Sequence, residues 1–245
     1  MFWRKQRAAI KRFHPLHRAL VLERGFTVSL RRDDWEPMIQ SLAGHSQHVR
    51  RRRWAPPERA AGIVVPMLRV LAADMRPEGV LSVAADLRGA DVPQKNGPAH
   101  DLPVQRPILS IKQWYAVDPW LRMRAELRDG SVLELSVTER LRKRQIRKRN
   151  PRGKIKSKRK SKSVHLIRVT RRLPKGATVR RPGAPPPGWI RVQVRQGTRM
   201  VIRTNAKIHG TRPDAQLIES ILLVSTEAFR WTPPGTAAPA ARRTT

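Results

Sequence analysis

The fold is decided by residues Leu121–Val137, whose sequence is LRMRAEL-RDG-SVLELSV. Apolar and polar residues alternate on both sides of Arg128–Gly130, which is typical of two β-strands that bury one face. A two-residue turn would place Leu133 on the wrong face, whereas a three-residue turn with Gly130 at positive φ brings all of the apolar side chains together. The predicted pairs are Leu127 with Ser131, Ala125 with Leu133, Met123 with Leu135, and Leu121 with Val137.

The same turn pattern recurs at two further places in the chain. Arg195–Gly197 would join two strands with Val194 opposite Thr198, Val192 opposite Met200 and Ile190 opposite Ile202. Pro77–Gly79 would join strands over 66–76 and 80–87, with proline at a turn position that suits its fixed φ. Three such hairpins predict a mainly β protein, an antiparallel sandwich or barrel.

Outside the hairpins, the sequence predicts few short helices and several loops. A helix over Trp35–Ala43 would follow Asp33 and Asp34 and stop at Gly44. Residues 213–229 fit a helix or a strand equally well. The remaining predictions are a basic amphipathic N-terminal segment over 1–15, a single β-rich domain over 16–231, loops over 89–107 and 182–188, and a disordered tail over 232–245.

A second stretch, Asn150–Lys162 (NPRGKIKSKRKSK), has lysine at every second residue from 154 onward. Pro151–Gly153 repeats the three-residue turn and predicts a long basic β-hairpin arm over 138–163. Val137 would then lie opposite Ile167 at an apolar base, and Arg142 opposite Lys162 farther out. At about 3.3 Å per residue, roughly twelve residues per strand reach about 40 Å.

Nine of the arm's predicted cations fall on one face, where like charges lie about 5 Å apart and repel one another. Phosphate groups would reverse this repulsion, and a two-stranded ribbon fits the major groove of B-DNA. Two alternatives remain open, a disordered solvated loop over 138–163 and a helix over 139–149. The candidate nucleic-acid-binding residues are Arg140, Arg142, Arg144, Lys148, Arg152, Lys154, Lys156, Lys158, Lys160 and Lys162.

The charge balance supports a polyanionic partner. The 245 residues include 52 Lys and Arg but only 18 Asp and Glu, a formal net charge of +34. Half of the basic residues lie between Glu139 and Asp214, where no acid occurs, and seven of the thirteen lysines fall within 143–162. A genome-wide preference for arginine does not explain that local choice of lysine.

Several classes of site are disfavoured. Cysteine is absent, so disulfides and thiolate metal sites are excluded. The pairs His14/His17 and His45/His48 have no third ligand in the sequence pattern, and Asp33, with Asp34 and Glu36, is a better helix cap than a magnesium site. No catalytic motif is present, so we expect neither an enzyme nor a bound metal or cofactor.

The aromatic residues allow two interpretations. Trp114, Tyr115 and Trp120 could stack on unpaired bases, but sandwich cores also bury tryptophan, which is the preferred reading for Trp120. Trp189 is equally ambiguous.

These features together predict a non-enzymatic protein that binds RNA or DNA, or a large ribonucleoprotein, mainly through phosphates and with little sequence preference. The alternative is a structural or assembly protein that binds an acidic protein or an anionic membrane surface, because the N-terminal segment is basic and amphipathic. No apolar run is long enough to cross a bilayer, and no signal peptide is evident. We expect a cytoplasmic or nucleoid-associated protein, with organellar targeting left open.

Overall fold

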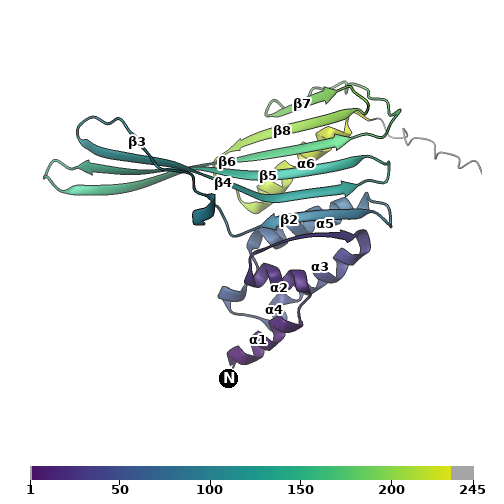
Figure 1. Cartoon of the computed structure of the whole chain (residues 1–245), viewed down its shortest axis with the longest axis horizontal. Helices are drawn as coiled ribbons and strands as arrows, with labels where there is room; N and C mark the ends of the chain where they lie inside the picture. Colours follow the sequence, from purple (N-terminus) through teal and green to yellow (C-terminus); the bar gives the residue numbers. More distant parts are fainter. Residues whose placement is uncertain (1, 233–245) are drawn as a thin grey trace, which may run out of the picture.

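The computed structural model describes residues 2–232, which form one antiparallel sheet with helices packed against it (Figure 1). The strand order is β1-β2-β4-β5-β6-β8-β7, and β3 pairs with β4 off this path. The strands are β1 (Gly25–Arg31), β2 (Val80–Asp86), β3 (His100–Leu102), β4 (Ile108–Glu126), β5 (Val132–Arg149), β6 (Ile155–Arg172), β7 (Ile190–Arg195) and β8 (Val201–His209).

Some helices cover one face of this sheet, and the N-terminal helices lie beyond its β1 edge. Both α5 and α6 pass behind the strands in Figure 1, and their buried residues, among them Leu71 and Ile221, share one core with Leu135 and Val169 of the sheet. The α-helices are α1 (Phe2–Arg12), α2 (Pro15–Leu22), α3 (Glu36–Ala43), α4 (His45–His48), α5 (Val65–Ala73) and α6 (Asp214–Phe229). The other short helices are the 3₁₀ helices η1 (Arg32–Trp35), η2 (Arg52–Trp54) and η4 (Pro93–Lys95) and the π-helix η3 (Ala60–Val64).

The prediction of a mainly antiparallel β protein with a long basic hairpin and short helices is confirmed. Ala125 lies opposite Leu133, Met123 opposite Leu135 and Leu121 opposite Val137, as the alternation requires. Gly130 has φ of 80°, the left-handed conformation that the three-residue turn needs. The sheet is single and open or curled, and helices occupy the face where a sandwich would place a second sheet.

The predicted register of the β7–β8 hairpin is wrong. Val194 lies opposite Ile202 rather than Thr198, because the connection between the strands is longer than three residues. The predicted and observed registers differ by four residues, an even number, so both keep Val192 and Val194 on the buried face. Alternation alone therefore could not distinguish them.

Other segments differ from the sequence-based expectation in type. Most of the residues predicted as a strand over 66–76 belong to α5 instead, which ends at Ala73 and buries Met67, Leu68 and Leu71 at helical spacing. The predicted loop over 89–107 contains η4 and β3.

The C-terminal ambiguity is resolved as a helix, because α6 buries Leu217, Ile221 and Val224 at intervals of four and three residues. The expected helix ending at Gly44 is present as η1 followed by α3. Most of the predicted disordered tail, residues 233–245, lies outside the described residues.

The N-terminal helices form a small core of their own. Ile10 of α1 is buried with Val21, Val49 and Trp54, and Phe13 packs at its edge. The basic amphipathic helix predicted near the N-terminus is therefore present, and the described part of its apolar face packs inside the protein. Within residues 2–232, no helix combines the length and the apolar character needed to cross a membrane.

Candidate nucleic-acid interface

The basic arm is the part of the molecule that projects from the body, and it is built from three long strands (Figure 1). Beyond the body, β5 pairs on one side with β6 and on the other with β4, from Asp118 opposite Glu139 out to Ile108 opposite Lys148. The two-stranded ribbon expected from the sequence is therefore corrected to a three-stranded arm. The short β3 adds a fourth strand beside Ile111–Gln113.

The predicted pairing of β5 with β6 is confirmed along its whole length, from Leu135 opposite Val169 to Lys148 opposite Lys156. Gly153 has φ of 76°, as its place at the end of the turn requires. Because opposite residues of an antiparallel pair point to the same side, this register places nine of the ten candidate residues on one face, and Arg152 lies in the turn. We call this side of β4, β5 and β6 the arm face.

The cations of the arm face have no acidic counterpart. Among residues 2–232, no carboxylate lies within 4.0 Å of the nitrogen atoms of any of the ten candidate residues. Arg144 Nε instead donates a hydrogen bond of 2.6 Å to Gln113 Oε1. Lys154 through Lys162 are exposed, whereas Arg142 and Arg144 are half-buried.

The opposite face of the arm carries fewer cations. Lys143 points to that side and pairs with Asp91, and Arg147, Arg149 and Arg159 alternate there with serine residues of β6. The excess positive charge is therefore concentrated on the arm face.

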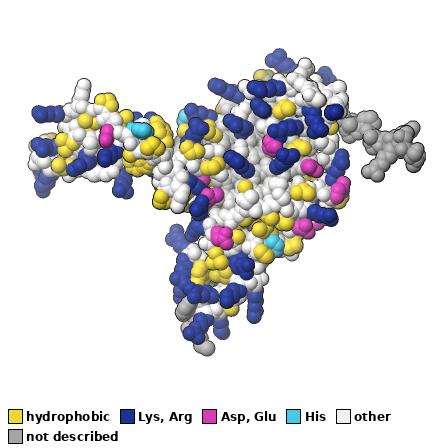
Figure 2. Space-filling model, viewed as in Figure 1, with side chains coloured by type: hydrophobic (Ala, Val, Ile, Leu, Met, Phe, Trp, Pro, Cys, Tyr) yellow, Lys and Arg dark blue, Asp and Glu magenta, His cyan; other side chains and the backbone are white. Residues whose placement is uncertain are grey.

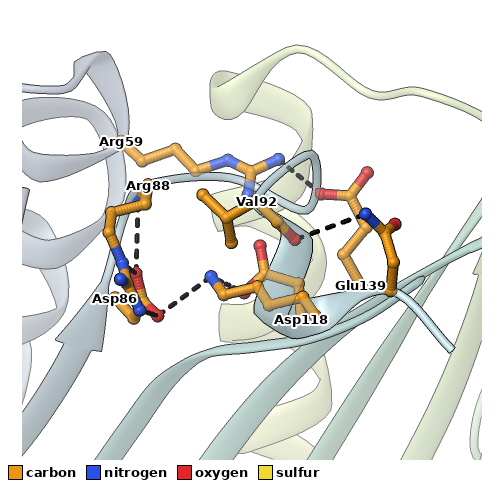
Figure 3. A network of polar contacts seen from close by, with 8 residues as sticks. Arg59, Asp86, Arg88, Val92, Asp118 and Glu139 are labelled. Carbon is orange, nitrogen blue, oxygen red and sulfur yellow. Dashed lines mark hydrogen bonds and ion pairs between the residues drawn. The ribbon is translucent and has the colours of Figure 1, made fainter.

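Three acids lie at the root of the arm and are already paired with basic side chains (Figure 3). Glu139 Oε2 accepts a hydrogen bond of 3.0 Å from Arg59, and Lys95 Nζ lies 2.6 Å from Asp118 Oδ1 and 3.0 Å from Asp86 Oδ2. Burial raises the pKa of the Asp118 carboxyl, whereas hydrogen bonding, chiefly from Arg88, lowers the pKa of Asp86.

This network anchors the arm but does not neutralise its face. Asp118 and Glu139 lie opposite each other on β4 and β5. Glu139 is two residues from the buried Val137 on the same strand, so both carboxylates point to the helix-covered side of the sheet. These two carboxylates and the cations of the arm face therefore lie on opposite sides of the same strands.

The arm face is continuous with the open face of the body sheet. On β6, Arg168 follows Lys162 on the same side of the strand, after the uncharged residues Val164 and Leu166, and it lies opposite Ser136 on β5 and Asn205 on β8. Figure 2 shows dark blue side chains along the arm and over the front of the sheet. The cations on this open face with no carboxylate within 4.0 Å among the described residues are Arg31, Arg122, Arg168, Arg191, Arg195, Arg203 and Lys207.

These body cations were not among the residues selected from the sequence. Each alternates with an apolar neighbour in its strand, as Arg168 does between Ile167 and Val169. That pattern marks an exposed strand position, but only the sheet order shows that these positions lie on the same side of the sheet as the arm face. Glu134, an acid on this face, pairs with Arg124 and Arg172.

The four aromatic candidates separate clearly in the structure. Trp120 is fully buried and belongs to the core, as preferred from the sequence. Tyr115 is 48% exposed and lies opposite Arg142, which places it on the arm face. Trp114 points to the other side, and Trp189 is exposed beside β7.

The histidines meet in a way that the sequence did not predict. His17 from one pair and His45 from the other are joined through Nε2 and Nδ1 at 3.0 Å, and His17 Nδ1 lies 2.9 Å from Ser41 Oγ. Within the described part of the chain, no group of three or more His, Asp or Glu side chains is arranged to hold a metal ion. The contact between α2 and α4 is therefore explained as packing of the N-terminal helices.

We expect this contact to make stability depend on pH. Burial, with the nearby His45 and His14, lowers the pKa of His17 to about 4 from 6.5. Below pH 6.5 the unfolded chain binds a proton that the folded chain does not, so stability falls as the pH falls towards 4. Between pH 7.5 and 5 the loss amounts to about 2 kcal/mol. Urea unfolding at both pH values, compared between wild type and H17Q, measures it, and equal pH dependence of the two proteins would contradict the assignment.

Comparison with known proteins adds no relative. No protein-family model matches the sequence, no curated protein matches it, and no solved structure matches the fold. The function is therefore inferred from the chain's own residues.

Proposed function

We propose that this chain is a non-enzymatic protein that binds nucleic acid mainly through its phosphates, with little sequence preference. The observation that carries the proposal is the arm face, an exposed row of cations without acidic partners that continues onto the open face of the sheet. Lysines that contact phosphate carry no base code, so affinity should vary little with sequence. We place this activity in the cytoplasm or on the nucleoid, with RNA and DNA both admitted.

The width of the arm limits how it can contact a nucleic-acid duplex. Three strands at about 4.8 Å span about 10 Å between the outer backbones before side chains are added. Once the lysine side chains of the edge strand β6 are added, the arm is too wide to enter the major groove of B-DNA, which is about 12 Å wide. The arm is therefore proposed to lie across phosphates on the outside of a duplex or along a single strand.

The rival function is an assembly protein that binds an acidic protein partner or an anionic membrane surface. The membrane variant relied on an amphipathic N-terminal helix, but Ile10 of that helix is buried and Phe13 stacks on His17 with ring centroids 4.1 Å apart. The described apolar face of α1 is thus occupied within the protein. The acidic-protein variant is left to experiment.

The wild-type protein tests this proposal directly. Labelled single-stranded and duplex oligonucleotides are titrated at several salt concentrations, with poly-glutamate and vesicles containing phosphatidylserine as competing polyanions. We expect log affinity to fall linearly with log salt, by about 0.9 unit for each phosphate contacted on duplex DNA. Poly-glutamate or vesicles that displace the oligonucleotides at matched charge concentration would favour the rival function instead.

A further inference from the structure

The arm face is not uniformly cationic, because its three strands carry three different rows of side chains. The β6 row is lysine, from Lys156 to Lys162, and the β5 row is mostly arginine, from Arg140 to Arg144. The β4 row is Ile111, Gln113, Tyr115 and Val117. At about 4.8 Å between strands, a tyrosine on β4 lies about 5 Å from the arginine row and about 10 Å from the lysine row.

Tyr115 is held in a defined position on this face. Its hydroxyl accepts a hydrogen bond of 3.1 Å from Gln113 Nε2, two residues earlier on the same side of the strand. Gln113 Oε1 in turn accepts from Arg144. The hydroxyl is therefore tied to a side chain of its own strand, while the side chain as a whole stays accessible to a ligand.

The backbone under Tyr115 is fixed on both edges. On one side β4 pairs with β5 at Arg142, and on the other the Tyr115 carbonyl accepts a hydrogen bond of 2.7 Å from Gly97 N. The side chain nevertheless remains 48% exposed. An exposed aromatic ring on an ordered strand costs little conformational entropy when a ligand covers it.

We infer that Tyr115 is a stacking site for an unpaired nucleobase of single-stranded nucleic acid, with the flanking phosphates on the arginine and lysine rows. This inference rests on the proposed function and makes it more specific. Aromatic side chains bind bases of any sequence because each base has a π face, and the bases of a duplex are not accessible in this way. The arm should therefore prefer single strands to duplexes by more than its charges alone account for.

The test combines Y115A with oligonucleotides that differ only in their bases. Stacking is worth about 1–3 kcal/mol per base, so Y115A should weaken binding to a base-bearing single strand by about 5- to 150-fold. Binding to an abasic oligomer of the same length, or to a duplex, should change by less than about twofold, and the salt slope should stay the same. Ribose and deoxyribose versions of each oligomer show which backbone is preferred.

Two matched variants control for the substitution itself. Y115F keeps the ring and loses only the hydrogen bond from Gln113, so it should retain most of the affinity that Y115A loses. V117A removes a neighbouring aliphatic side chain of the same row, 43% exposed, and should not show the loss specific to base-bearing strands. Melting temperatures of all variants should agree within a few degrees because both side chains are about half exposed.

The outcomes separate the two proposals. If wild type shows no salt-dependent binding to any oligonucleotide, the proposed function fails and the stacking site with it. If wild type binds but Y115A binds the base-bearing strand equally well, only the stacking site is overturned. Equal weakening on abasic, duplex and base-bearing oligomers would also overturn it, since Tyr115 would then act only by shaping the arm.

Discussion

Replacing Lys156, Lys158 and Lys160 together with glutamine is expected to weaken nucleic-acid binding by about 10²- to 10³-fold at roughly 0.1 M salt. All three side chains are exposed on the arm face, opposite Lys148, Ile146 and Arg144 of β5. Each lost phosphate contact should reduce the slope of log affinity against log salt by about 0.9 unit for duplex DNA, and three contacts account for this factor. Fluorescence anisotropy over a range of salt concentrations measures both quantities.

The same triple variant should lose affinity for unrelated sequences by a similar factor, because no base contact is removed. Its melting temperature without ligand should stay level or rise, since the change relieves repulsion between opposite cations. The matched control replaces Lys175, Arg180 and Arg181, three exposed cations in the loop after β6, at the end of that strand away from the arm's tip. An unchanged salt slope in the arm variant would show that the lysine row is only a solvated edge, as charged residues often are on edge strands.

Replacing Trp120 with alanine is expected to lower the free energy of unfolding by about 3–5 kcal/mol. Trp120 is fully buried, at the irregularity where the β4–β5 register shifts between Asp118 and Leu121. The guanidinium of Arg59 lies 4.8 Å from its ring centroid, and the same Arg59 binds Glu139 at the root of the arm. The cavity would therefore remove packing and a cation–π contact together.

Urea unfolding followed by far-ultraviolet circular dichroism measures this loss without depending on tryptophan fluorescence. W120F should cost less than half as much, because it fills most of the space and removes an indole N–H that has no hydrogen-bond partner in the described residues. W189A is the matched control, since Trp189 is 41% exposed and its loss should cost less than about 1 kcal/mol. A W120A protein as stable as the W189A control would show that this corner of the core can collapse around the gap.

The sequence alone determined those parts of the fold that depend on local rules. For the β4–β5 and β5–β6 hairpins, alternation excludes any odd shift, which would expose Leu133 and Leu135, and the three-residue turn ending in glycine selects one of the remaining registers. The structure confirms that choice at both hairpins, although the same turn rule fails at β7–β8. The face shared by Arg140 through Lys162 follows from the β5–β6 register without further information.

Where local rules admitted more than one answer, the tertiary structure decided. The β7–β8 register could shift by an even number without exposing Val192 or Val194, and 66–76 carried both a turn-flanked apolar run and a helical spacing. Packing against the sheet selected the helix, because α5 buries the apolar side chains on one face of β2 and β4.

The tertiary structure also decided which distant residues act together. The extension of β4 into the arm brings Tyr115 beside Arg142, although 27 positions separate them in the chain. Arg203 and Lys207 lie on the same side of the sheet as the arm face only because β8 pairs with β6. A sequence read along one strand specifies which side each residue faces, but strand order depends on long-range packing energies that no local pattern contains.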